Sequence, residues 1–178
     1  MAAAGSLDLD VLVDAPAWEA ALPEADQWCR RAARAAFARS WFRPQPAAAT
    51  LVLADDVRVA GLNRAFRGID APTNVLSFPA ENDPAPGAPP SGDGVDDPAE
   101  PAAVLGDIII AYETVAAEAH RDGKSLGAHL SHLVVHGILH LLGYDHQTDS
   151  EAEVMENLET AVLAGLGIAD PYAGMYDD

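Results

Sequence analysis

One stretch of the sequence decides which fold to expect, and it reads His136-Gly-Ile-Leu-His-Leu-Leu-Gly-Tyr-Asp-His146 at the end of a long apolar segment. His136 and His140 are four residues apart, so on a helix their imidazoles project from the same face. Gly143 can adopt the left-handed conformation that ends a helix, and the chain can then fold back to bring in His146. Three converging imidazoles suit a zinc-like divalent ion with one position open for water or substrate. The stretch therefore predicts a metal site at the end of a long helix.

The spacing of the three histidines is also that of the ligands in the metzincin zinc proteases. Those enzymes carry a glutamate directly after the first histidine as the general base, and here this position is Gly137. The spacing supports a metal ion, whereas the missing base argues against peptide hydrolysis. Three neutral imidazoles leave the double charge of the ion uncompensated, which favours an anionic substrate such as a phosphodiester. The sequence does not fix the metal, because nickel, copper and cobalt also accept imidazole ligands.

Two neighbouring side chains are candidates for supporting roles at this site. His132 lies one helical turn before His136, where it can support a ligand, donate to substrate or simply pack as a buried polar residue. Asp145 can orient an imidazole, as carboxylates beside metal ligands do, or serve as a turn residue after Gly143. The sequence does not decide between these roles for either residue.

Outward from this stretch, apolar strands alternate with amphipathic helices. The hydrophobic spacing and the capping residues predict a long helix over 125–142, which Ser125 would cap. Such an alternation predicts an α/β or α+β domain built around one small sheet. The other expected strands are 7–13, 50–54, 74–78 and 106–111, and the other expected helices are 23–40, 56–66, 112–120 and 149–163.

Composition predicts one soluble domain over residues 1–178, with 49% hydrophobic and 21% charged residues. Cys29 is the single cysteine, which excludes an internal disulfide and fits a reducing compartment. The N-terminus resembles no signal peptide and no apolar run is long enough for a membrane span, so we expect a cytoplasmic protein. Residues 81–102 are rich in Pro, Gly and Asp and contain no Lys or Arg, which is typical of a mobile acidic loop insertion.

The charge distribution is uneven. The formal net charge is −18, which would repel nucleic acid. Eight of the ten cationic residues lie between positions 30 and 67, where only Asp55 and Asp56 oppose them, so that segment is net +6. The segment can form a polyanion-facing surface that shares a groove with the histidines, or its first arginines can be the solvated face of a helix.

Several motifs together resemble the YbeY endoribonucleases, also described as rRNA maturation factors. The histidine stretch, preceded by His129-Leu-Ser-His132-Leu-Val-Val, is similar to the family signature. The resemblance covers roughly residues 50–172 and is highly specific in these blocks. Two further segments agree with it, Leu62–Asp70 followed by Pro72–Pro79, and Leu105–Ile110.

The resemblance implies a single-domain α+β fold with a small, mostly parallel sheet packed by helices, and a zinc-type site held by His136, His140 and His146. It implies a single-strand-specific endoribonuclease that matures the 3′ end of small-subunit rRNA and takes part in ribosome quality control. Single-stranded and ribosomal RNA, together with the ribosome or its small-subunit proteins, are the expected partners. His136 and Arg67 are the expected catalytic residues.

Arg67 is the position that corresponds to the family's functional arginine. A guanidinium there can grip two phosphate oxygens at once, although a salt bridge with Asp70 or Asp107 is the alternative. Asn74 can line the same cleft.

Two other functions remain possible on the same residues. One is a zinc peptidase-like hydrolase on the same ligand frame. The other is a non-catalytic ribosome-associated factor with a structural metal, although structural zinc sites usually have four protein ligands.

Overall fold

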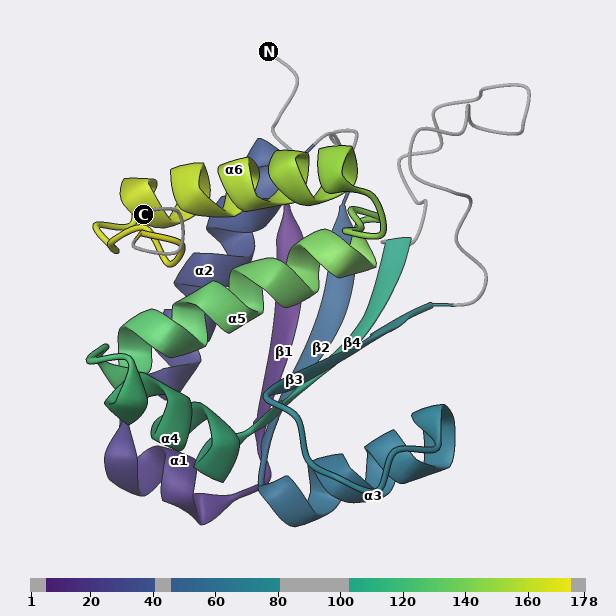
Figure 1. Ribbon diagram of the computed structural model, residues 1–178, viewed down its shortest axis with the longest axis vertical. Coiled ribbons are helices and arrows are strands. Elements are labelled where there is room, and N and C mark those ends of the chain that lie inside the picture. Colours follow the sequence, from purple (N-terminus) through teal and green to yellow (C-terminus); the bar gives the residue numbers. More distant parts are fainter. Residues whose placement is uncertain (1–5, 41–45, 81–102, 174–178) are drawn as a thin grey trace.

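The computed structural model describes residues 6–40, 46–80 and 103–173, so the predicted acidic loop 81–102 lies outside the described residues. Four strands and six helices are found in these ranges (Figure 1). The strands are β1 (Leu7–Val13), β2 (Ala47–Ala54), β3 (Val75–Pro79) and β4 (Ala103–Ala111). The helices are α1 (Pro16–Ala21), α2 (Ala25–Arg39), α3 (Asp56–Arg67), α4 (Tyr112–Arg121), α5 (Leu126–Leu141) and α6 (Asp149–Gly165).

The four strands form one sheet in the order β1-β2-β4-β3. β1 and β4 both pair with β2 in parallel, whereas β3 is an antiparallel edge strand that pairs with β4. The register places Leu51 opposite Ile108, and Ile110 opposite Val75. The sheet is therefore mixed and mostly parallel, and the predicted α+β fold is confirmed.

The two faces of the sheet carry cores of different size. Alternate side chains point to opposite faces of a strand, so Leu51 and Leu53 of β2 enter the larger core while Val52 enters the smaller one. α2, α5 and α6 contribute to the larger core, and α3 covers the smaller one beside β3 (Figure 1). α5 thus lies against one face of the sheet while its C-terminal end stays beside the β3 edge.

Local signals explain where α5 begins and ends. The Ser125 side chain accepts a hydrogen bond from the Ala128 N–H at 3.1 Å, so the predicted cap is confirmed. At the other end Gly143 has a φ of 96°, a left-handed value that turns the chain back towards the helix. Within the helix, Gly127 allows close packing on α2, because a Cβ there would lie 2.7 Å from the Trp28 ring.

Some expected boundaries differ from the observed ones. β2 and β4 begin earlier than predicted, at Ala47 and Ala103, and α1 was not predicted. α6 is capped by Thr148, through a reciprocal capping box with Glu151. No helix in the described part of the chain has the length and apolar character needed to cross a membrane.

Candidate metal centre

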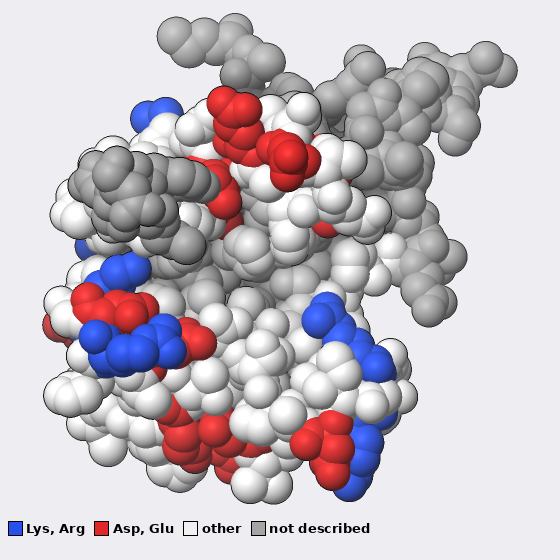
Figure 2. Space-filling view, viewed as in Figure 1, with Lys and Arg blue, Asp and Glu red and all other residues white. Residues whose placement is uncertain are grey.

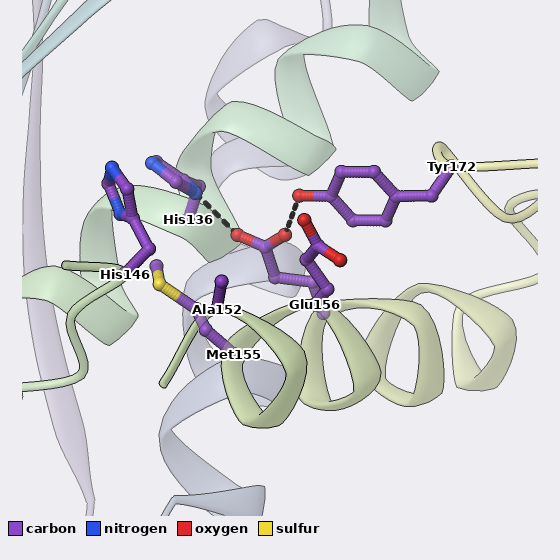
Figure 3. A pocket seen from close by; sticks show the side chains of 7 residues that line it. His136, His146, Ala152, Met155, Glu156 and Tyr172 are labelled. Carbon is purple, nitrogen blue, oxygen red and sulfur yellow. Dashed lines mark hydrogen bonds and ion pairs between the residues drawn. The ribbon is translucent and has the colours of Figure 1, made fainter. Parts of the chain in front are cut away.

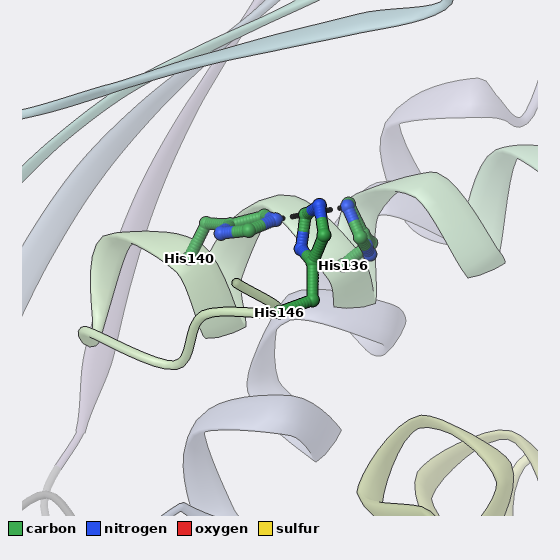
Figure 4. A group of neighbouring side chains, drawn as sticks. All are labelled: His136, His140 and His146. Carbon is green, nitrogen blue, oxygen red and sulfur yellow. Dashed lines mark hydrogen bonds between the residues drawn. The ribbon is translucent and has the colours of Figure 1, made fainter. Parts of the chain in front are cut away.

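Three histidine side chains meet at the C-terminal end of α5. His136 and His140 project from this helix, and His146 reaches them from the turn that leads to α6 (Figure 4). One ring nitrogen of each lies within 4.8 Å of the other two. The Nε2 atoms of His136 and His140 are 3.0 Å apart. The helix and the turn at Gly143 thus bring together the three predicted ligands.

This donor set fits a divalent metal ion. Two imidazole nitrogens that bind one tetrahedral zinc at its usual bond length are about 3.3 Å apart, close to the separation of the two Nε2 atoms. An imidazole must be neutral to bind a metal. Burial, and then the neighbouring His136 and His146, lower the pKa of His140 from 6.5 to about 4, so His140 is neutral at pH 7.

A carboxylate of α6 supports the first histidine. Glu159 is fully buried, and its Oε1 lies 2.5 Å from Nδ1 of His136. The Tyr172 hydroxyl donates a hydrogen bond to Oε2 of the same carboxylate, and Nε2 of His132 lies 3.5 Å from that oxygen. In Figure 3 His136 and Tyr172 lie on opposite sides of the pocket, and dashed lines mark the contacts that both make with Glu159. Glu159 thus joins residues of α5, α6 and the segment after α6.

The charge of Glu159 is stabilised despite its burial. Burial raises the pKa of this carboxyl, but hydrogen bonds from His132, His136 and Tyr172 outweigh it and bring the pKa from 4.5 to about 2. Sequence reasoning missed Glu159, because its partners are distant in sequence. One signal was available: Glu159 lies one turn after the buried Met155 and shortly before the buried Val162, on the apolar side of α6.

His132 and Asp145 take different places around the site. His132 points to the carboxylate of Glu159 and to the Tyr172 hydroxyl, each at 3.5 Å. Asp145 accepts a hydrogen bond from the His146 N–H at 2.8 Å, which stabilises the turn that carries this histidine. Its side chain also lines the cavity beside the histidines.

A cavity of about 510 Å³ opens beside the three histidines, and Arg67 lines it. Arg67 is the last residue of α3, where Gly68 adopts a left-handed φ of 68°. Alternate residues of the edge strand β3 form another wall, since they share one face of the sheet. The remaining lining residues come from the start of β3, the end of α5 and the turn after it; the full lining is Arg67, Asn74, Val75, Ser77, Pro79, His136, His140, Gly143, Tyr144, Asp145 and His146.

The guanidinium of Arg67 is exposed and forms no ion pair with any carboxylate in the described ranges. The alternative salt bridge of Arg67 with Asp70 or Asp107 is therefore absent there. Asp70 lies 3.9 Å from Arg64 instead. The arrangement leaves the Arg67 guanidinium available to an anion in the cavity.

Asn74 lines the same cavity, but the protein itself occupies both polar ends of its side chain. Its amide nitrogen donates to Glu118 at 3.1 Å, and its oxygen accepts from the Val75 N–H at 2.7 Å. Glu118 in turn lies 2.7 Å from the buried His129. These contacts anchor the start of β3 to α4 and α5.

Arg67 does not share its cavity with the other arginines of the basic segment that the structure describes. Arg31 lines a separate small depression between α2, α5 and the residues that follow α6. Arg30 pairs with Asp26, and Arg58 lies 2.8 Å from Asp14. In Figure 2 several basic side chains of this face lie directly beside acidic ones, at the left and over α3 at the lower right. Among the described arginines of this segment, Arg67 lines the cavity of the histidines and the others do not, so the predicted shared groove is found for Arg67 alone in the described ranges.

A second cavity beside the histidines is lined by acidic rather than basic side chains. It measures about 240 Å³ and lies on the α6 side, where no described Lys or Arg lines it. Glu156 and Glu159 contribute carboxylates to its walls. An anionic group therefore fits the Arg67 side of the site better than the α6 side.

The residue after the first histidine has little space for a side chain. A Cβ at Gly137 would lie 3.0 Å from Cδ1 and 3.1 Å from Cγ2 of Ile108 on β4. This position faces the sheet, so a larger side chain there would have to displace the Ile108 side chain.

Comparisons with known proteins agree with this geometry. The family model described as Endoribonuclease YbeY matches residues 17–167. The protein named Endoribonuclease YbeY from Paramagnetospirillum magneticum is 49% identical over 171 residues, which cover 94% of this chain and 96% of the relative. The protein of the same name from Jannaschia sp. is 45% identical and covers 93% of this chain and 100% of its own length.

A solved structure shows the same fold. The solution structure of TM1509 from Thermotoga maritima aligns with a TM-score of 0.51 and 21% sequence identity, over 92% of this chain and 97% of that one. The family match spans most of the chain and includes the three histidines and Arg67. The chain therefore belongs to the YbeY endoribonuclease family.

Proposed function

We propose that this protein is a metal-dependent endoribonuclease that cleaves single-stranded RNA. The observation that carries the proposal is that Arg67 and the three histidines line one cavity, although they come from opposite sides of the β3 edge. A cationic guanidinium beside a metal-binding triad is suited to a phosphodiester, whose charge both groups stabilise. The names of the relatives, which describe endoribonucleases, support the same reaction class.

In this mechanism each side chain has a separate task. A zinc or other transition-metal ion held by His136, His140 and His146 would supply Lewis acidity and an activated water. Arg67 binds the non-bridging oxygens of the scissile phosphate and holds the RNA in the cavity. Asn74 keeps the start of β3 in place beside the phosphate, through its contacts with Glu118 and Val75.

The biological substrate that we propose is the 3′ end of small-subunit rRNA, with a role in ribosome quality control in the cytoplasm. Single-stranded ends and loops expose bases that can splay apart, so one phosphate can enter a concave site more easily than in a duplex. The whole chain, residues 1–178, would act as one domain and meet the ribosome or its small-subunit proteins.

Two observations favour this proposal over the alternatives. A structural zinc would need a fourth protein ligand, but the group found in the described ranges contains three histidines and no other side chain. Cys29 is buried elsewhere, and burial raises the pKa of its thiol to about 12, so it is a poor ligand. The glycine at position 137, where the metzincin frame has a glutamate, also leaves a peptidase without its base.

The test compares two substrates of the same sequence. Metal-loaded protein would be incubated with a single-stranded rRNA 3′ fragment and with the same fragment annealed to its complement. We expect internal cleavage of the single strand and little cleavage of the duplex. Equal cleavage of both would contradict strand selectivity, and cleavage of neither would contradict the nuclease assignment.

A further inference from the structure

We propose that Glu159 is a positioning residue that fixes the tautomer and orientation of His136. The inference rests on the proposed function, because it concerns the histidine that would bind the metal. Glu159 comes from α6, whereas His136 comes from α5, so the contact also joins the two helices. Neither the histidine spacing nor the family match assigns this role.

The burial of Glu159 needs a reason. Its side chain is fully buried on a helix face where Met155, Val162 and Leu163 are also buried. A buried carboxylate is costly unless it is paired and hydrogen-bonded, and an apolar side chain would fit the rest of this face. The cost is offset here because His136, His132 and Tyr172 all approach the same carboxylate.

The contact with His136 selects one tautomer. An ionised carboxylate only accepts hydrogen bonds, so Nδ1 of His136, 2.5 Å from Oε1, must carry the proton. The lone pair then lies on Nε2, the nitrogen that is 3.0 Å from Nε2 of His140. Glu159 therefore presents the free nitrogen to the metal site, as carboxylates hydrogen-bonded to metal-binding histidines generally do.

Tyr172 completes the arrangement from the segment after α6. Asp170 accepts hydrogen bonds from the Tyr172 N–H at 2.9 Å and from the Thr160 hydroxyl at 3.2 Å, which fixes this segment against α6. The tyrosine hydroxyl then donates to Oε2 and leaves Oε1 for His136. Each carboxylate oxygen thus has its own donor, which keeps the group charged and oriented.

The first test measures the tautomer directly. Histidine-labelled, metal-free protein would be studied by ¹⁵N NMR at neutral pH, with Glu159→Leu and Glu159→Gln as variants. Glu153→Gln is the matched control, because Glu153 is an exposed carboxylate on the same helix. We expect the Nδ1–H form of His136 in the native protein and in the control. Glu159→Leu should shift His136 towards the Nε2–H form, and Glu159→Gln should shift it less.

The second test measures zinc affinity by competition with a chelator. Loss of such a supporting carboxylate weakens metal binding by about 10–100-fold, which is the loss expected for Glu159→Leu. Tyr172→Phe should weaken zinc binding less, and Glu153→Gln should leave it unchanged. A folded Glu159→Leu protein with the native tautomer and native zinc affinity would overturn the inference.

If Glu159→Leu does not fold, the native protein and the Glu159→Gln variant provide the test. An Nε2–H tautomer of His136 in the native protein, or native zinc affinity in a folded Glu159→Gln variant, would then overturn the inference. The NMR measurement needs neither metal nor RNA. A native protein that keeps the Nδ1–H form but cleaves no RNA would therefore contradict the proposed function and leave the role of Glu159 intact.

Discussion

The proposed phosphate site depends on Arg67 and on the helix end at Gly68, the next residue. Gly68 ends α3 in the left-handed conformation, so Arg67 becomes the last helical residue and its side chain lines the cavity beyond the β3 edge. No carboxylate of the described residues neutralises it. The position thus leaves its charge for a ligand.

The first prediction concerns this charge. Arg67→Ala should lower kcat/KM for single-stranded RNA by about 10²–10³-fold, as loss of one donor to a developing charge does. The free energy of unfolding of this variant should differ from that of the native protein by less than about 0.5 kcal/mol, because the Arg67 side chain is exposed. Arg64→Ala is the matched control, since Arg64 is exposed on the same helix but does not line the cavity. Equal losses in both variants would contradict a specific role for Arg67.

The second prediction follows from the pKa of His140, which falls from 6.5 to about 4 in the folded protein. Between these values the unfolded chain binds a proton that the folded protein does not bind, so the free energy of unfolding should fall as the pH drops from 6.5 to 4. Glu159, with its pKa lowered from 4.5 to about 2, adds a further loss below pH 4.5.

Denaturant titrations of metal-free protein at several pH values between 7 and 4 would measure this dependence. His140→Asn should show a smaller loss of stability across pH 6.5 to 4 than the native protein. An identical pH dependence in the two proteins would show that His140 does not cause it.

Site residues that lie close together in the sequence could be predicted to meet, whereas contacts between distant residues could not be predicted. The helical spacing of His136 and His140 and the glycine at 143 brought the three predicted histidines together, because each step involves a few residues. Glu159 was missed because its contact with His136 depends on how α6 packs on α5. The candidate position of Arg67 came from the family resemblance, since nothing local links it to the histidines.

At the scale of elements, the glycines of two helices have opposite consequences for packing. A Cβ at Gly127 of α5 would lie 2.7 Å from the Trp28 ring of α2, whereas a Cβ at Gly61 of α3 would meet nothing within 4 Å. Close approach of α2 and α5 therefore depends on the missing side chain at Gly127. Gly61 has no such role.

The third prediction compares these two positions by thermal or chemical denaturation. Gly127→Ala should destabilise the protein by about 1–3 kcal/mol, because the added methyl overpacks the α2–α5 contact. Gly61→Ala should stabilise it by up to about 1 kcal/mol, through the better helix propensity of alanine. The same sign of change at both positions would contradict this account of the α2–α5 contact.

Element types were predictable where one face of a helix or strand carries the signal. α5 and its Ser125 cap follow from a local pattern of apolar residues and a capping side chain. The early starts of β2 and β4 could not be predicted from a local pattern. Ala47 and Ala103 belong to strands because they pair with each other across the sheet. α1 is a single short helix fixed by Trp18, whose indole donates to the Ala54 carbonyl at 3.0 Å.

At the scale of the whole molecule, the sheet order places Arg67 and the histidines on one cavity. β3 is the antiparallel edge strand, so the end of α3 and the end of α5 can both face the cavity without another strand between them. This order is set by pairing between distant segments, which the sequence pattern alone does not reveal. The formal net charge of −18 repels a polyanion such as RNA, which makes Arg67, the arginine of the described residues that lines the cavity, more important for binding.

The fourth prediction concerns the salt dependence of RNA binding. If Arg67 supplies most of the phosphate contact, the slope of log K against log salt should be shallow, about −0.7 to −1.4 for one or two contacts with a single strand. Binding of a fluorescent single-stranded RNA by a chelated, inactive protein would give this slope. A slope steeper than about −3 would mean that further arginines also contact the RNA.

Whether the histidine triad and Arg67 take part in RNA cleavage can be tested with a single-stranded rRNA 3′ fragment, with the metal content of the protein measured in parallel. Native metal-loaded protein, chelated protein, His136→Ala and Arg67→Ala would be compared at equal concentration. We predict cleavage by the native protein, its loss after chelation and in His136→Ala, and strongly reduced cleavage in Arg67→Ala with native metal content. Equal cleavage by His136→Ala and the native protein would contradict the account, because the histidine triad would then have no part in the reaction.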